Sequence, residues 1–145
     1  MPTGYSPKLP LTLSDSDGYT LTKTPAEMAS QNFKNLMLTS PGERIMDPEF
    51  GAGLRRYLFE QNTTLTIREI RGRIQSQISI YMPYIRLVRT RFFAGGTPET
   101  TDFEESYRVG DFFFERGQEE NLLYISIEYE IIPLNFKTFL NINVT

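Results

Sequence analysis

This 145-residue chain predicts an α+β fold, with about three helices packed on one face of a mostly antiparallel sheet. Two observations support the prediction. Apolar residues recur at helical spacing up to about residue 82, whereas from residue 84 onward they alternate along extended segments. The length suits a single domain that buries one core. We assign residues 1–23 to an extended N-terminal arm and residues 24–145 to the α+β domain.

The first helix has a complete start signal. Residues 9–22 alternate on both sides of a turn-forming stretch, which predicts a short extended arm or hairpin. Thr24 then precedes Pro25 and Glu27, so Thr24 caps the helix, Pro25 occupies its first position and Glu27 completes a capping box. The helix runs to about Leu38. Its apolar stripe is Ala29, Phe33, Leu36 and Met37.

Two more helices are expected. A short one covers Leu54 to Glu60, and a longer one opens at Thr66, with Glu69 placed for another capping box. Proline disfavours helical geometry in the residue before it, so Met82-Pro83 ends the long helix. Its apolar positions are Ile67, Ile70, Ile74, Ile78 and Tyr81.

Four extended segments follow the helices. The first, from 85 to 92, is rich in β-branched and aromatic residues, and the second, from 107 to 114, is interrupted at Gly110-Asp111. Residues 123–131 alternate apolar and polar positions, which indicates a strand with one dry face. Residues 135–145 form one more strand, with apolar groups at even positions.

Composition excludes several classes of function. The chain has no cysteine and no histidine, so it lacks thiolate chemistry, disulfides and the commonest general base and metal ligand. No apolar run approaches a membrane span and no signal peptide is evident, so we expect a soluble, cytoplasmic product with no cofactor, metal or membrane partner. Residues 1–94 carry a net charge of +4 and residues 95–145 carry −7. This asymmetry allows docking by opposite faces or internal pairing.

The stretch from Thr39 to Leu54 contains two prolines, three glycines and a Glu-Arg pair, which predicts an ordered, chain-bending loop. Arg44 offers a rigid donor fork for a carboxylate on a neighbouring chain, and Phe50 is a potential anchor. Pro48 and Gly51 would fix the loop. The alternative is an internal salt bridge of Glu43 or Arg44, with Phe50 covering the protein's own core.

The sequence also contains residues suited to two other kinds of site. Glu43 with Asp47 or Glu49 could supply the two carboxylates of a peptidoglycan-cleaving glycosidase, although nothing in the sequence indicates an apolar pocket that would raise a carboxyl pKa. Eight arginines between residues 54 and 91 could bind nucleic acid. Because the whole chain is acidic, a solvated or protein-binding face is the better interpretation, and we expect no nucleic-acid partner.

Several motifs appear in an order that resembles a known family. They are Asn35-Leu36-Met37-Leu38-Thr39, Gly42-Glu43-Arg44, Pro48-Glu49-Phe50-Gly51, Leu58-Phe59-Glu60 and the isoleucine-rich helix. Together they resemble the baseplate wedge family of contractile injection machines, often labelled "lysozyme-like". That family includes the protein that starts the tail sheath in contractile-tailed phages and its counterpart in type VI secretion baseplates. The resemblance runs from about Leu9 to Ile132.

The resemblance implies a structural, non-enzymatic component that joins the wedge core to the first sheath ring and templates sheath assembly by strand addition. The implied partners are wedge core proteins and the tail sheath protein, with tube or hub proteins as further candidates. The implied location is the tail baseplate of a virion, assembled in the host cytoplasm.

The resemblance also implies which residues bind each partner. The family's Glu-Pro-Arg motif is replaced here by Met82-Pro83-Tyr84, which suggests an apolar or aromatic contact in its place. The expected wedge-binding residues are Glu43, Arg44, Pro48, Phe50, Gly51, Met82, Pro83, Tyr84 and Arg86. The expected sheath-binding residues are Leu123, Ile125, Ile127, Tyr129 and Ile131.

Overall fold

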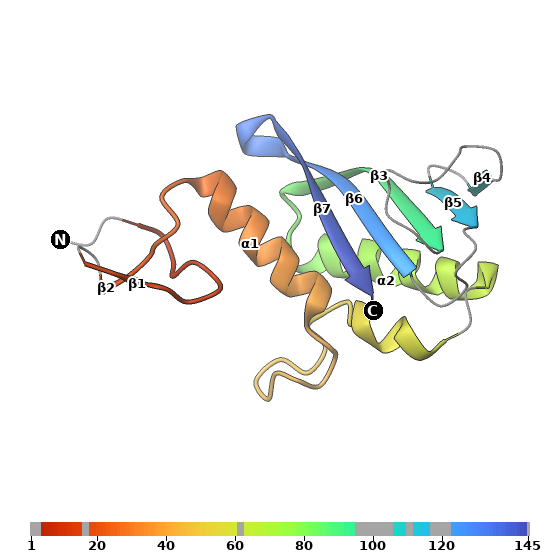
Figure 1. Cartoon of the computed structure of the whole chain (residues 1–145), viewed down its shortest axis with the longest axis horizontal. Coiled ribbons are helices and arrows are strands. Elements are labelled where there is room, and N and C mark those ends of the chain that lie inside the picture. Colours follow the sequence, from red (N-terminus) through yellow and green to blue (C-terminus); the bar gives the residue numbers. More distant parts are fainter. Residues whose placement is uncertain are drawn as a thin grey trace.

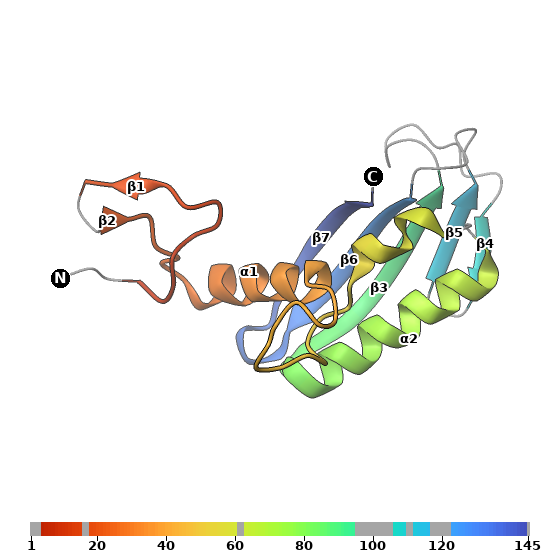
Figure 2. The same cartoon turned by 90° about the horizontal axis from the view of Figure 1, so that it is seen from below.

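In the computed structural model, the chain forms a five-stranded sheet with its helices on one face, and a small arm reaches away from it (Figures 1 and 2). The structure describes residues 4–15, 18–60, 63–94, 106–109, 112–116 and 123–144. The arm contains β1 (Leu13–Ser14) and β2 (Gly18–Tyr19). The helices are α1 (Pro25–Leu38), η1 (Leu54–Phe59), α2 (Thr64–Tyr81) and η3 (Ile132–Leu134). The strands of the main sheet are β3 (Ile85–Ala94), β4 (Ser106–Val109), β5 (Phe112–Arg116), β6 (Leu123–Ile131) and β7 (Phe136–Val144).

Helix α1 begins as the sequence predicts. The Glu27 backbone N–H donates to Thr24 Oγ1 at 3.2 Å, and the Glu27 carboxylate accepts from the backbone N–H groups of Lys23 and Thr24. These backbone donors favour the charged carboxylate and lower the Glu27 pKa from its ordinary value. The predicted capping box is therefore confirmed, and it fixes where the domain's first helix starts.

The predicted count of three helices is wrong, because the described residues contain two α-helices and short 3₁₀ turns. Leu54–Phe59 is a 3₁₀ helix, as expected for a six-residue segment that is too short to nucleate an α-helix. Helix α2 starts two residues earlier than predicted, and Thr63 is its cap, since the Thr66 N–H donates to Thr63 Oγ1. Glu69 instead accepts a hydrogen bond from the Tyr57 hydroxyl at 3.1 Å.

The sheet has the order β4-β5-β3-β6-β7. All neighbouring strands are antiparallel except β3 and β5, which run parallel. Strand β6 therefore lies between β3 and β7, with Ile127 opposite Thr90 on one side and Leu140 on the other. Strand β7 forms one edge of the sheet that the structure describes. The predicted strands at 85–92, 123–131 and 135–145 are confirmed, whereas the single segment predicted at 107–114 is two antiparallel strands, β4 and β5. The sequence did not indicate which strand is at the edge.

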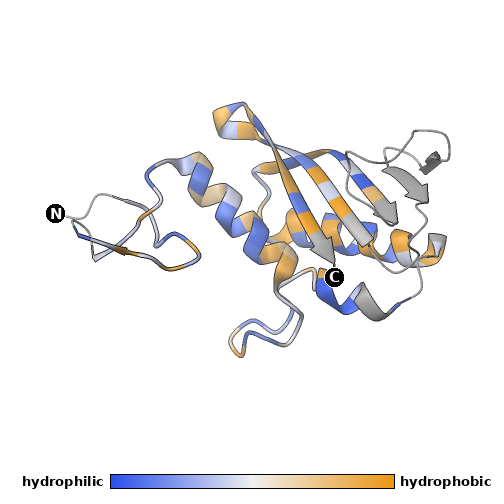
Figure 3. Ribbon diagram, in the orientation of Figure 1, coloured by the Kyte–Doolittle hydropathy of each residue, from blue (hydrophilic) through white to orange (hydrophobic). Residues whose placement is uncertain are grey.

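The core lies between the helices and the inner face of the sheet. Phe33 of α1 packs against Tyr129 of β6, with ring centroids 4.3 Å apart. Hydrophobic and hydrophilic bands alternate along the strands in Figure 3, as expected where successive side chains point to opposite faces of a sheet. The largest fully buried side chains are Phe33, Leu36, Met37, Leu54, Tyr57, Ile70, Ile74, Phe92, Ile125, Ile127 and Tyr129.

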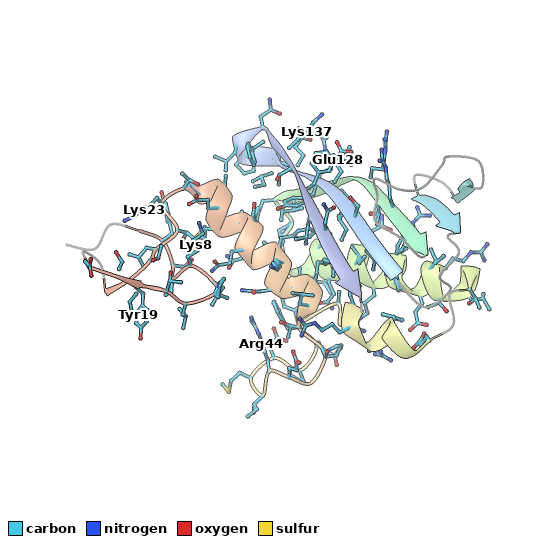
Figure 4. The ribbon with its side chains drawn as sticks, in the orientation of Figure 1. Lys8, Tyr19, Lys23, Arg44, Glu128 and Lys137 are labelled. Carbon is cyan, nitrogen blue, oxygen red and sulfur yellow. The ribbon has the colours of Figure 1, made fainter. Side chains whose placement is uncertain are left out.

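The Gln31 side chain of α1 contacts the backbone of the arm at two positions. The Gln31 amide accepts from the Leu9 N–H at 2.9 Å and donates to the Pro7 carbonyl at 2.8 Å. Lys8 and Lys23 lie on this arm near the start of α1 (Figure 4). Within the described part of the chain, no helix is long and apolar enough to cross a membrane.

Candidate functional site

The loop between α1 and η1 is closed at its base by backbone hydrogen bonds. The Gly42 N–H donates to the Pro48 carbonyl at 2.8 Å, and the Ser40 N–H donates to the Glu43 carboxylate at 2.8 Å. The loop then returns to α1, where the Ala52 N–H donates to the Leu36 carbonyl at 2.9 Å. The predicted ordered loop is thus present, and Glu43 stabilises the loop from within.

Helix α2 holds the other side of the loop through Gln77. This buried amide accepts from the Gly51 N–H at 2.7 Å and donates to the Glu49 carbonyl at 3.0 Å. Arg73 Nη2 also donates to the Gly51 carbonyl at 3.3 Å. Gly51 has φ of +111°, and a Cβ at this position would collide with the Thr39 carbonyl. Only glycine fits here.

Three side chains stack beside the loop. The Arg44 guanidinium lies 3.6 Å from the centre of the Phe50 ring, and Phe50 meets Tyr81 edge-to-face at 4.9 Å. The Tyr81 hydroxyl donates to Asp47 Oδ1 at 2.9 Å. Burial, followed by this hydrogen bond and the charge of Asp47, raises the Tyr81 pKa above its ordinary value. Phe50 is half-buried, so it supports the loop more than it projects from it.

The structure brings the loop and the corner after α2 together around one cavity of about 300 Å³. Arg44 and Phe50 line it from the loop, and Met82 and Tyr84 line it from the corner. Pro83 is exposed beside it, and burial raises the Tyr84 pKa. The two segments of the predicted wedge surface, which are separated in the sequence, are therefore neighbours in space.

Two predicted wedge residues are less available to a partner than expected. The Met82 side chain is only 4% exposed and belongs to the core, so it cannot project toward a partner as expected. Arg86 faces the opposite side of the sheet, where its Nε donates to Glu130 Oε2 at 3.0 Å. Both differences follow from strand and helix geometry that local sequence does not show.

Sequence reasoning missed the most exposed part of the loop. Ile45 and Met46 are 95% and 96% exposed, and the hydrophobic tip of the loop projects away from the domain in Figure 3. The signal was present as two adjacent apolar residues inside a stretch rich in Pro and Gly. Arg44 is labelled on the same loop in Figure 4.

Four of the five predicted sheath-binding side chains lie inside the protein. Ile125, Ile127, Tyr129 and Ile131 are each 2% exposed or less, because they form the dry face of β6 against the helices. The backbone of Leu123 pairs with both β3 and β7. Neither edge of β6 is free. In the described sheet, the edge strands are β4 and β7.

Beside the β7 edge lies a groove of about 730 Å³ between the arm, α1 and β7. Leu9 of the arm, Ala26 and Ser30 of α1, and Phe136 and Leu140 of β7 contribute to its walls, which are mostly apolar. Phe139, on the same strand, is 65% exposed. The groove and the edge form a continuous surface.

The residues of the two alternative sites are used in other ways. Glu43 accepts from the Ser40 N–H within the loop, and Asp47 accepts from the Tyr81 hydroxyl of α2. Among the described residues, no carboxylate lines the cavity beside the loop. The described residues bring together no group of carboxylates able to hold a metal ion. Among the arginines, Arg56 lies over the Tyr57 ring and Arg73 binds the Gly51 carbonyl.

A small α+β domain with a rigid presenting loop and a grooved sheet edge defines a protein-interaction module. The model of the family "Baseplate wedge protein gp25" matches residues 26–133, which is more than half of the chain. The chain therefore belongs to the baseplate wedge protein gp25 family. No curated protein matches it.

Solved structures share the fold. One chain of the anti-feeding prophage baseplate, solved by cryo-electron microscopy and six-fold symmetrised, is 25% identical with a TM-score of 0.59, over 87% of this chain and 83% of that chain. A protein from Geobacter sulfurreducens described as a tail lysozyme is 21% identical with a TM-score of 0.57, over 86% of this chain and 93% of that chain. At that identity, the second likeness shows only the fold.

Proposed function

We propose that this chain is a non-enzymatic structural link in a tail baseplate. One surface binds the wedge core, and the other starts the contractile sheath by accepting a strand. The domain of residues 24–145 carries both surfaces, and the arm of residues 1–23 borders one of them. Family membership and the likeness to a baseplate chain support the general role. The observation that supports the sheath role is that β7 lies at one edge of the described sheet, next to the groove.

An added strand would find both of its usual requirements at β7. Alternate residues of an edge strand direct their N–H and C=O groups away from the sheet, where another backbone can pair with them. The groove next to this edge then offers an apolar site for every second side chain of the incoming strand. Backbone pairing supplies affinity, and the groove supplies register.

The contacts of β6 define its part in this proposal. Its inward side chains, such as Ile127, hold β7 in place by packing the core beneath the sheet. The sheath surface is therefore the β7 edge together with the groove, while β6 provides the support. Lys8, Leu9 and Pro10 of the arm form the far wall, so the arm limits where an incoming strand can lie.

The wedge surface is proposed at the loop and the corner around the smaller cavity. The described residues place no carboxylate against the Arg44 guanidinium, which stacks on Phe50 with its donors available to a partner. Exposed Pro83 and half-buried Tyr84 extend the surface to the other side of the cavity. These contacts replace the charged Glu-Pro-Arg anchor expected from the family.

A pair of proline variants tests the strand-addition proposal. Thr138→Pro and Phe139→Pro remove neighbouring N–H groups, of which one points toward β6 and the other points outward. Thermal unfolding identifies the outward position, because only the inward proline breaks the β6–β7 ladder. Deleting the C-terminal strands would be less informative, since it removes β6 together with β7, and the inward side chains of β6 belong to the core.

The measurement is sheath initiation on purified baseplates carrying each variant, counted by electron microscopy. The stable, outward proline should leave the chain bound to the baseplate and reduce initiated sheaths at least tenfold. Normal initiation by that stable variant would refute strand addition at β7. Loss of the chain from the baseplate would instead place the wedge contact at this edge.

A further inference from the structure

We propose that Ile45 and Met46 form an apolar knob that inserts into a pocket of a baseplate wedge protein, and that this pocket is apolar with basic side chains at its rim. This inference rests on the proposed wedge-binding role. The two side chains are the most exposed large hydrophobic residues of the part of the chain that the structure describes. Neither the sequence prediction nor the family match assigns them a role.

The exposure of the knob is enforced by its anchors. Arg44 stacks on Phe50 on one side of the tip, and Asp47 accepts from the Tyr81 hydroxyl on the other. Below them, the hydrogen bond from Gly42 to Pro48 closes the loop. The tip therefore cannot fold back onto the domain without breaking these contacts. A fixed, protruding apolar pair has its binding geometry arranged before a partner arrives.

The charges around the knob indicate the chemistry of the pocket. Residues 40–50 carry three carboxylates, from Glu43, Asp47 and Glu49, and one cation, from Arg44. Glu49 is exposed beside the tip. A net charge of −2 disfavours an anionic lipid surface and favours a protein pocket with Lys or Arg at its rim. Protruding shape and baseplate family membership both point to insertion into a neighbouring subunit.

The knob also lies beside the cavity shared with Tyr84 and Met82, because Arg44 both flanks the tip and lines that cavity. A wedge protein that covers the tip would therefore cover the cavity as well. The interface would then have an apolar centre at the knob and a polar border at the cavity, which is the usual anatomy of a protein interface.

The first experiment measures affinity for the purified wedge sub-complex of the same baseplate. Ile45→Ser with Met46→Ser removes the knob, and Leu65→Ser with Ile80→Ser is the control, since these α2 side chains are 71% and 63% exposed. The knob variant should bind at least tenfold more weakly, and the control should bind within about threefold of the unmodified chain. Both should keep their unfolding temperature, because all four side chains are exposed.

The outcomes distinguish this inference from the wider proposal. If the unmodified chain does not bind the wedge sub-complex, the proposed function fails. If that chain binds and the knob variant binds equally well, only the knob is refuted. Affinity of the unmodified chain should also fall as salt rises, and an affinity that rises with salt would contradict the basic rim.

A photo-cross-linking residue at position 46 in assembled baseplates gives an independent test. A cross-link to a wedge protein supports the knob. A cross-link to a second copy of this chain, or to the sheath protein, would overturn the assignment. The same cross-linker at position 65 provides the background on an exposed helix face that the inference does not involve.

Discussion

Gly51 provides the sharpest test of how the presenting loop is held. Its φ of +111° lies where L side chains are rarely found, and substitution there costs about 1–3 kcal/mol from backbone strain. A Cβ would also lie 2.8 Å from the Thr39 carbonyl carbon and closer still to its oxygen, so the backbone must move. Forcing extra volume into a packed site adds about 1–3 kcal/mol. We therefore expect Gly51→Ala to lower the free energy of unfolding by about 3 kcal/mol or more.

Two other glycines separate these causes. Gly42 has φ of +89° but open space around its Cβ position, so Gly42→Ala should cost only the strain, about 1–2 kcal/mol. Gly72 lies in α2 with neither restriction, so Gly72→Ala should stabilise the protein by about 0.5–1 kcal/mol. Urea unfolding followed by circular dichroism measures all three. A Gly51→Ala cost no larger than that of Gly42→Ala would refute the proposed clash.

Three further predictions concern an ion pair, a hydrogen bond and the ionisation of tyrosines. Arg86→Ala should lower the free energy of unfolding by about 1–2 kcal/mol, because it leaves the buried Glu130 carboxylate without this partner. The loss is moderate because the arginine is exposed and its charge is partly screened by solvent. An unchanged midpoint of urea unfolding would contradict this prediction. Tyr81→Phe removes the hydrogen bond to Asp47 and should lower the midpoint of urea unfolding, and an unchanged midpoint would be the contrary result. The free energy of unfolding should fall as pH rises above about 10, because a tyrosine in the unfolded chain ionises at lower pH than a folded tyrosine whose pKa is raised. A Tyr57→Phe variant should show a shallower fall. The groups with raised pKa are Tyr57, Tyr81, Tyr84 and Tyr129.

Local signals predicted the elements well. The capping box at Thr24 and Glu27 is local to four residues, and the structure confirms it. The alternation along 123–131 also correctly predicted a strand with one dry face. The start of α2 was misplaced because Thr63 and Thr66 are both acceptable caps, and the choice depends on where the chain arrives from η1.

The candidate surfaces were harder to predict, because exposure is a tertiary property. An apolar strand face has the same sequence pattern whether it packs on the protein's own helices or on a partner. The sequence therefore did not indicate that Ile125 and Ile127 are buried inside this chain. Phe50 and Met46 are both apolar loop residues, yet only the stack with Tyr81 shows that Phe50 supports the loop and Met46 projects. Which strand forms the edge depends on the strand order, and this is not encoded in any one segment.

Helix α1 connects the two proposed surfaces. Ala26 and Ser30 in its first half line the groove beside β7, and its last turn holds the loop through the Leu36 carbonyl. A helix of 14 residues spans about 21 Å, and Phe33 fixes its middle to the sheet through Tyr129. A wedge protein on the loop and a sheath strand at β7 would therefore be held at a set distance by one rigid element. A substitution of Phe33 that weakens the packing of α1 on the sheet should therefore leave partial binding of the wedge protein and of the sheath strand. It should abolish sheath initiation, because the template requires both surfaces in register.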